Sequence, residues 1–367
     1  MTIGVIAVYS ASSEILLIHG FKATVYGQKQ LLYAFFGVLI CLVCYSINLD
    51  YLRRGKLLLL VIVADLLVYV RLFGQAVNGA KGWINLGPIN IQPLELAKLV
   101  LTLYLARMLA KADGRLVRGH IISQLLPTAI IAGVLMILVL IEPDFGGTAI
   151  LFCLVLIMYS VSGIPTGYIL LSIIGITVLV VGGFSLIVAW NPSFLQDVYV
   201  YKRFIAFLHP FKTAANEGAQ LVNSYYAIHN GGLFGLGLGN SIQKRGYLPE
   251  PYTDFILSII AEEVGSLGAL VVLGLLFYLM ILIMERGVKA QSQYSTLICF
   301  GVTAIIFFQT LFNVGAVLGL MPITGVTLPF ISYGGSSLWV LSAAIGLVLN
   351  VTAEEKNRQE VQAEDEY

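Results

Sequence analysis

Apolar runs of about 20 residues, the length that spans the hydrocarbon core of a bilayer, recur along almost the whole chain. The chain is 58% hydrophobic and 11% charged, whereas soluble domains carry about 25% charged residues. The runs are continuous and do not alternate with polar residues, which argues against an outer-membrane β-barrel. The sequence therefore predicts an all-α, polytopic membrane protein.

The apolar runs predict about ten transmembrane helices within one membrane domain, residues 1–353. Their predicted ranges are 2–14, 30–48, 57–74, 93–111, 121–141, 147–162, 165–190, 254–284, 295–320 and 330–352. The first is short for a span, because polar residues follow from Ser10 onward. Residues 354–367 are polar and acidic, which predicts a disordered cytoplasmic tail.

Lysines and arginines in the short connections predict the orientation, since cytoplasmic loops carry an excess of them. One side has the larger number, namely Arg53, Arg54, Lys56, Arg107, Lys111, Arg115, Arg118, Arg286 and Lys289. The other side has Lys22, Lys29, Arg71 and Lys81. This asymmetry predicts that both termini are cytoplasmic and that the polar stretch 191–253, between the seventh and eighth helices, is extracellular.

Composition also argues against a nucleic-acid partner and a redox site. The formal net charge is +1 and no basic cluster stands out, so a nucleic-acid partner is not expected. Cys41 and Cys44 form a C-x-x-C pattern that could indicate a redox or metal pair. Because both lie inside an apolar run, we interpret them as packing residues.

The polar stretch 191–253 is the largest place on this chain where chemistry on a polar substrate could occur. It leads into Tyr247 to Phe255, with Asp254 where the next apolar helix begins. A carboxylate at this position could simply cap the helix, or it could be catalytic. Glu262 and Glu263 lie further along the same helix, where acids are costly unless a partner or a polar chamber receives them.

Two further acidic motifs have both a structural and a functional interpretation. Glu95 and Lys98 are three residues apart and so share a helix face; they could form a structural ion pair or line a polar cavity. Glu142 and Asp144 flank a proline in a short turn, where they could be solvated acids or face a substrate. Asp65 lies within an apolar run, and the sequence leaves its role open.

Basic and glycine-rich segments lie within the long polar stretch. Lys202 and Arg203 precede aromatic residues in a segment that could lie in the membrane interface, although an arginine there also suits a phosphate. The glycine-rich segment 230–240 has no preceding strand, so it is not a dinucleotide fingerprint. Its glycines are expected to permit close backbone approach.

Four motifs occur in the order found in a known family of membrane proteins. They are Gln92-Pro-x-Glu95-x-Ala-Lys98, Glu142-Pro-Asp144-x-Gly, Tyr247-Leu-Pro-Glu-x-x-Thr-Asp254-Phe and the segment from Asn313 to Ser337. Together they resemble the SEDS proteins (shape, elongation, division and sporulation), and the resemblance covers nearly the whole chain. The chain departs from the family pattern in its short first helix, in Phe145 and in Glu142.

The resemblance implies a peptidoglycan glycosyltransferase that polymerises lipid II at the outer face of the bacterial plasma membrane. Asp254 falls on the family's proposed catalytic base, which would deprotonate the acceptor 4-hydroxyl for attack at C1 of the donor sugar. Undecaprenyl diphosphate would leave with inversion, and such a leaving group needs no paired acid. Members of the family work with a class B penicillin-binding protein within the division or elongation machinery.

The resemblance also implies a set of substrate-binding residues. Arg203 and Lys202 match the family's basic position, and Glu95 and Lys98 match its salt-bridged pair beside the central cavity. The remaining expected substrate-binding residues are Lys81, Glu250 and Ser332. A carboxylate beside a diphosphate leaves a role for a divalent cation open, although no ligand cluster with recognisable spacing is present.

Motif details favour a division-type member over an elongation-type polymerase. Gly239-Asn-Ser241-x-Gln-Lys244 and Tyr247-Leu-Pro-Glu250 resemble the division members more closely. Two other classes remain as alternatives, a lipid II flippase and a scaffold without chemistry. A flippase would need a polar path through the membrane, for which Asp65, Glu95 and Lys98 are the deep candidates.

Overall fold

The computed structural model describes residues 1–77, 80–87, 89–112, 121–165, 167–168, 170–175, 178, 182, 199–216 and 218–365. The helices are α1 (Thr2–Ile18), α2 (Val25–Ser46), α3 (Leu49–Phe73), α4 (Pro93–Ala112), α5 (Ile121–Ile141), α6 (Phe145–Val161), α8 (Tyr199–Leu208), α9 (Ala219–Gly231), α10 (Ile256–Lys289), α11 (Gln293–Val317) and α12 (Gly335–Asp365). The strands are β1 (Gln75–Val77), β2 (Ala80–Asn85) and β3 (Asn90–Ile91), which pair antiparallel in that order.

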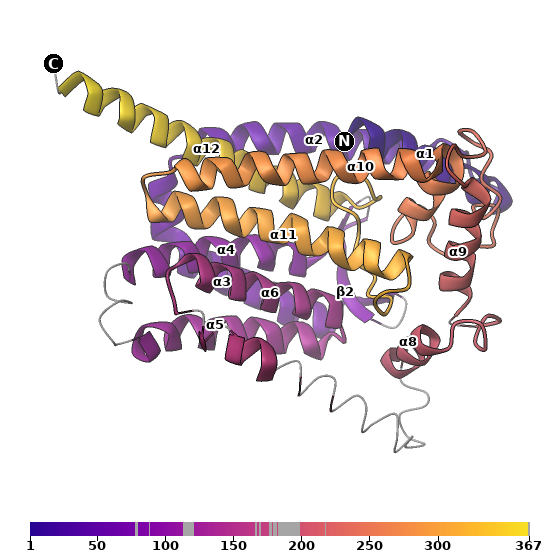
Figure 1. The fold of residues 1–367 in the computed structure, drawn as a ribbon, viewed down its shortest axis with the longest axis horizontal. Helices are drawn as coiled ribbons and strands as arrows, with labels where there is room; N and C mark the ends of the chain where they lie inside the picture. Colours follow the sequence, from indigo (N-terminus) through magenta and orange to yellow (C-terminus); the bar gives the residue numbers. More distant parts are fainter. Residues whose placement is uncertain are drawn as a thin grey trace.

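The long helices lie side by side around α4 (Figure 1). α4 packs against α3, α5, α6, α11 and α12, and nearly every side chain from Pro93 to Ala106 is buried. Apart from the paired Glu95 and Lys98, this buried part of α4 is largely apolar around its circumference, which suits a central position. The sheet, α8 and α9 lie toward one end of the bundle, and the C-terminal part of α12 projects from the other (Figure 1).

Several helices have the length and apolarity of membrane spans. Among the described residues these are α2, α10, α11 and the part of α12 from Gly335 to Arg358. α1, the segment Leu125–Ile141 and α6 are apolar but shorter. α10 leaves Leu270 and Val271 exposed, as expected of side chains that face lipid. The predicted all-α membrane fold is confirmed.

The first helix extends to Ile18, beyond its predicted end at residue 14. α1 packs against α2 and α10. Ser10 and Ser12, two of the residues that made this segment look too polar for a span, are buried in the protein. The sequence pattern misplaced the helix end because these side chains are buried in protein and do not face lipid, and Ser10 donates to Glu263.

α10 is broken at Gly265, and the glycine-rich segment fills the break. Gly265 has φ 84° and ψ 169°, outside the helical region. The amide of Gly237 donates to the carbonyl oxygen of Glu263 at 2.9 Å, and the amide of Ser266 donates to that of Gly232 at 2.9 Å. These bonds satisfy groups that a broken helix leaves without partners. The expectation that the glycines allow close backbone approach is confirmed.

The two acids near this break are buried and fully partnered. Glu263 accepts from Lys244 Nζ at 2.8 Å and from Ser10 Oγ at distances of 2.7 and 2.6 Å. Glu262 accepts from the Ser241 hydroxyl, from Asn230 Nδ2 at 3.0 Å and from a backbone amide. The sequence indicated that these acids need partners inside the protein, and the structure confirms this.

The polar stretch 191–253 is not one irregular loop. Residues 191–198 lie outside the described residues, and the remainder contains α8 and α9. α9 packs against α10 and α11, and its Leu221, Val222 and Ala227 are buried. The polar composition of the stretch hid this short amphipathic pattern, because tertiary packing stabilises short helices more than their own propensity does.

The acidic tail that was predicted to be disordered is helical as far as Asp365, because α12 continues through it. Glu354 accepts from Arg53 of α3 at 3.2 Å. Glu355 is buried and accepts from the amides of Gln291 and Ser292, the two residues before α11. Glu354 and Glu355 therefore have specific partners elsewhere in the fold, which a purely compositional argument could not include.

Two other segments bear on the sequence predictions. Most of the predicted helix 165–190 lies outside the described residues, although residues 167–168 and 170–175 are helical. The sheet between α3 and α4 was not predicted. Its strands are too short to show a clear alternation of apolar and polar residues. β2 pairs with β1 in the register Gln75 opposite Trp83, and with β3 in the register Ile84 opposite Ile91.

Candidate active site

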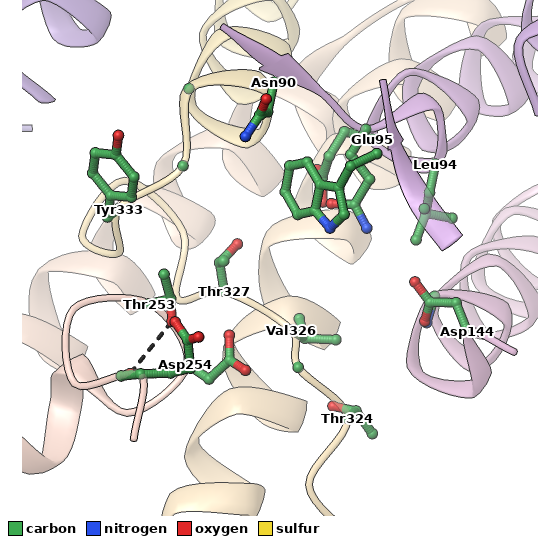
Figure 2. Close-up of a pocket in the computed structure, with 18 of the residues that line it drawn as sticks. Asn90, Leu94, Glu95, Asp144, Thr253, Asp254, Thr324, Val326, Thr327 and Tyr333 are labelled. Atoms are coloured by element: carbon green, nitrogen blue, oxygen red, sulfur yellow. Dashed lines mark hydrogen bonds between the residues drawn. The ribbon is translucent and has the colours of Figure 1, made fainter. Parts of the chain in front are cut away.

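A cavity of about 380 Å³ opens at the end of the bundle that carries the sheet. It lies where α2, β2, the α5–α6 turn, α8 and the segments 250–254 and 324–327 meet. Figure 2 shows that residues far apart in sequence converge here, with Asp254 and Thr327 across the view from Asp144. Its charged lining residues are Lys29, Glu95, Lys98, Glu142, Asp144, Arg203, Glu250 and Asp254.

Asp254 presents a carboxylate that the helix after it does not use. α10 begins at Ile256 with Phe255 at its N-cap, and no side chain caps it. The main chain around Asp254 is held from two sides, because Asn313 donates to the Asp254 carbonyl oxygen at 2.8 Å and Ser332 donates to the Thr253 carbonyl oxygen at 2.7 Å. The helix-capping interpretation is therefore not supported, and the half-buried carboxylate lines the cavity.

The pKa of Asp254 is raised to about 6. Burial is the largest cause, because removing a carboxylate from water disfavours its charged form. Glu250 and Asp144 raise the pKa further, while the nearby Arg203 guanidinium lowers it. A carboxylate with a pKa near 6 is ionised at neutral pH and is a stronger base than an ordinary aspartate.

Arg203 and Asp254 interact electrostatically, and both side chains lie close to Gly325. Arg203 Nη1 donates to the Ile323 carbonyl oxygen at 3.0 Å, which fixes the guanidinium against the segment before α12. A Cβ on Gly325 would lie 3.6 Å from Asp254 Oδ2 and 3.8 Å from Arg203 Nη1. The absence of that carbon leaves space in which a reacting group could contact both the carboxylate and the guanidinium.

Glu95 and Lys98 form a buried ion pair that also lines the cavity. Lys98 Nζ is 2.8 Å from Glu95 Oε2, and both side chains are almost completely buried. Gln309 Nε2 of α11 donates to both Glu95 oxygens, at 3.4 and 3.3 Å. The structural and the cavity-lining interpretations of this pair therefore both apply.

Glu142 and Asp144 of the α5–α6 turn face the same cavity. Asp144 caps α6 by accepting from the Gly147 amide at 2.7 Å, and burial raises the pKa of its carboxyl group. Burial is also the main cause that raises the pKa of Glu142 to about 8, with a further contribution from Asp144. At neutral pH Glu142 is therefore mostly protonated, which limits the repulsion among the acids.

The remaining predicted binding residues have different positions. Glu250 lines the cavity and accepts from Thr253 Oγ1 at 3.0 Å. Ser332 does not line it. Its hydroxyl accepts from the Leu328 amide and donates to the Thr253 carbonyl oxygen. Lys202 is half-buried on α8 and is not a lining residue.

Two predicted positions give less structural information. Lys81 lies in β2, but its side chain is outside the described residues. Asp65, whose role the sequence left open, is exposed on α3 and does not line the cavity. No group of three His, Cys, Asp or Glu side chains able to hold a metal occurs among the described residues.

Sequence reasoning missed the aromatic side of the cavity. Tyr26 and Lys29 come from the first turns of α2, and Tyr252 and Tyr333 come from the segments before α10 and α12. Each is unremarkable as a single residue in an apolar sequence. The available signal was the spacing of three between Tyr26 and Lys29, which places both on one helix face.

The chain matches a family model described as cell cycle protein, which comprises FtsW, RodA and SpoVE, over residues 1–357. It is 38% identical to the probable peptidoglycan glycosyltransferase FtsW of Enterococcus hirae, over 97% of this chain and 91% of that protein. The corresponding FtsW of Bacillus subtilis is 36% identical, over 97% and 90% respectively.

Solved structures resemble it as well. A chain from a study of how a peptidoglycan synthase complex coordinates polymerization and crosslinking matches with a TM-score of 0.74 and 28% identity, over 96% of each chain. RodA of Thermus thermophilus, a rod shape determining protein, matches with a TM-score of 0.65 and 28% identity, over 96% of this chain and 95% of that one. The ordered motifs, the helical fold and these matches agree, and the chain belongs to the FtsW/RodA/SpoVE family.

Proposed function

We propose that this chain is a peptidoglycan glycosyltransferase that polymerises lipid II into β-1,4-linked strands, and that it serves septal wall synthesis in division. The observation that carries the proposal concerns the Asp254 carboxylate, which does not cap α10. It lies with the Arg203 guanidinium beside the open space at Gly325. Relatives named probable peptidoglycan glycosyltransferase FtsW support the activity.

The proposed reaction uses Asp254 as general base. Its carboxylate takes the proton from the 4-hydroxyl of the acceptor sugar as that oxygen forms a bond to C1 of the donor. The bond from C1 to the diphosphate oxygen breaks, and undecaprenyl diphosphate leaves with the electron pair. Arg203 stabilises the negative charge that develops there, and the proton on Asp254 is later released to water.

The buried groups around Asp254 support this role by fixing its position. Asn313 and Ser332 hold the main chain at Asp254 and Thr253, which favours catalysis because a base must be placed accurately. We therefore assign Ser332 a positioning role and not direct contact with substrate. The Glu95–Lys98 pair lies on the cavity wall, where Lys98, almost completely buried against Glu95, is proposed to act on a substrate anion through its charge.

We also propose that the cavity faces the outside of the plasma membrane. α10 runs from the cavity to the end that carries Arg286 and Lys289, and Arg53 lies near the last helix at that end. Basic connections favour the cytoplasmic side, so the end of α12 is proposed to be cytoplasmic, while the N-terminus of α1 lies partway along the bundle (Figure 1). A class B penicillin-binding protein is the proposed partner, supported by the similarity to a chain of a peptidoglycan synthase complex.

The test is reconstitution of the purified chain with its penicillin-binding partner and lipid II. Glycan polymer is expected from the wild type and none from Asp254→Asn. The matched control is Asp50→Asn, an exposed aspartate that pairs with Arg53 far from the cavity. Polymer from Asp254→Asn at the wild-type rate would falsify the assignment of the base.

The same reconstitution separates the other function classes. Translocation of labelled lipid II across proteoliposomes, with no polymer from the wild type, would indicate a flippase. Polymer made only when the partner supplies its own transferase activity would indicate a scaffold. A flippase was expected to use Asp65, Glu95 and Lys98 for a polar path through the membrane. Asp65 is exposed on α3 and does not line the cavity, which counts against that path.

A further inference from the structure

Three tyrosines form an aromatic wall on one side of the cavity. The ring centroid of Tyr26 lies 4.9 Å from that of Tyr252 and 4.9 Å from that of Tyr333. The Tyr333 amide donates to the Tyr252 carbonyl oxygen at 2.9 Å, which joins the two segments that supply these rings. All three rings are half-buried and line the cavity, so each has a surface that a ligand can contact.

Lys29 lies beside this wall. It follows Tyr26 by three residues on α2, and its Nζ atom is 6.0 Å from the Tyr26 ring centroid. The side chain is half-buried and lines the cavity. Among the residues that the structure describes, it makes no ion pair with any carboxylate.

In the described part of the chain, the other two cations that line the cavity, Lys98 and Arg203, have partners within the protein. Lys98 is paired with Glu95 at 2.8 Å, and Arg203 donates to the Ile323 carbonyl oxygen beside Asp254. A half-buried ammonium without a neutralising carboxylate is costly unless another anion approaches it. Lys29 therefore has the character of a receptor for a ligand's negative charge, and a lysine binds phosphate well as a point charge.

The proposed reaction needs two anionic sites. Both substrates of lipid II polymerisation carry a diphosphate. The diphosphate of the donor is its leaving group and must lie at Arg203, next to Asp254. The acceptor presents its 4-hydroxyl to Asp254, so its own diphosphate must lie at the far end of its disaccharide, away from Arg203.

We infer that Lys29 and the wall of Tyr26, Tyr252 and Tyr333 form the subsite for the acceptor. Lys29 binds the acceptor diphosphate, and the tyrosine rings contact the apolar faces of the amino sugars between Lys29 and Asp254. The tyrosine wall extends from Lys29 toward Asp254. Lys29 Nζ lies over the Tyr26 ring, and the Tyr26 ring contacts that of Tyr252, which is two residues before Asp254. The inference rests on the proposed function and names one of its substrate sites.

The binding experiment uses Asp254→Asn protein in nanodiscs, so that lipid II is not consumed. Native mass spectrometry is expected to show two bound lipid II molecules per chain, and one after the further change Lys29→Ala. Lys29→Arg should restore two. Lys22→Ala is the matched control, because Lys22 is an exposed lysine just before α2 and does not line the cavity.

Chemical selectivity separates phosphate recognition from sugar recognition. Undecaprenyl diphosphate, which has no sugars, should still need Lys29 at the second site, so its second binding event should disappear with Lys29→Ala. Tyr26→Leu should weaken binding of lipid II at least fivefold but leave binding of the sugar-free diphosphate unchanged. Tyr26→Phe, which keeps the ring, should bind lipid II as the parent protein does.

The kinetic experiment uses the intact active site with the penicillin-binding partner. Lys29→Ala should raise KM for lipid II at least tenfold while kcat changes less than threefold, and Lys29→Gln provides a second variant if the alanine protein does not fold. Two bound lipids in the Lys29→Ala protein, or an unchanged KM in either variant, would overturn the subsite. Failure of the wild type to polymerise lipid II would instead overturn the proposed function.

Discussion

Asn313 of α11 joins the two segments that carry the proposed base and its neighbouring loop. Its Nδ2 atom donates to the carbonyl oxygen of Asp254 at 2.8 Å and to that of Val326 at 2.8 Å. Asn313 is itself almost completely buried. A single amide group thus fixes the distance between the backbone at Asp254 and the backbone beside Gly325, across the space where the reaction is proposed to occur.

Replacing Asn313 should therefore impair catalysis more than folding. Asn313→Ala leaves two carbonyl oxygens without this donor, at a cost to stability of about 1–3 kcal/mol. Polymerisation should fall at least tenfold, since a small displacement of a catalytic group has a large effect. The control is Thr310→Val, because the Thr310 hydroxyl, one turn earlier, donates to the Ile306 carbonyl oxygen within α11 itself. Equal activity in both variants would contradict the positioning role.

Gly325→Ala should reduce polymerisation strongly. The added methyl group would contact Asp254 Oδ2 at 3.6 Å and Arg203 Nη1 at 3.8 Å, in the space proposed for the reacting atoms. Gly325 also has φ +75°, and a left-handed backbone costs a non-glycine residue about 1–2 kcal/mol. Gly239→Ala controls for that strain, because Gly239 has φ +84° and open space around its Cβ position. Lipid II turnover should be near wild type in Gly239→Ala and at least tenfold lower in Gly325→Ala.

Activity should rise with pH across the pKa of Asp254. The base acts only when it is deprotonated, and its pKa is about 6. Below pH 6, kcat/KM should fall about tenfold per pH unit, and above pH 7 it should be flat until another group titrates.

Variants at Arg203 and Glu142 test whether the fall in kcat/KM at low pH, the acid limb of the profile, reports the titration of Asp254. Arg203→Gln removes the cation that lowers the pKa of Asp254, so the midpoint of the limb should move to higher pH. Glu142→Gln removes a different cavity acid and should leave the midpoint near 6. A limb that disappears in Glu142→Gln would show that Glu142, and not Asp254, is the group that titrates.

Breaking the buried pair of Lys244 and Glu263 should destabilise the protein. Lys244→Met leaves the Glu263 carboxylate buried with Ser10 as its remaining side-chain donor, and loss of one partner of a buried pair costs about 3–5 kcal/mol. Thermal unfolding in detergent should show a clear loss, and the double variant Lys244→Met with Glu263→Met should recover much of it. Lys289→Ala, which breaks an exposed pair with Glu285, should cost less than about 1 kcal/mol.

The sequence by itself determined the membrane fold and several local relationships. Long apolar runs have few alternatives to spanning helices, because lipid cannot satisfy backbone polar groups. A spacing of three was enough to place Glu95 and Lys98 on one helix face. The cost of acids within an apolar helix likewise showed that Glu262 and Glu263 need partners. The end of the polar stretch placed Asp254 where the next helix begins, and α10 starts two residues later, at Ile256.

Tertiary structure alone decided which of these groups meet. Nothing local to Lys29, Tyr333 or Arg203 shows that they share a cavity with Asp254, because those contacts join segments that are far apart in the sequence. Ser332 belongs to a matching motif, yet its hydroxyl is bound within the protein. Hydropathy and local spacing determine which segments become helices, whereas side-chain packing between helices determines which of their ends converge.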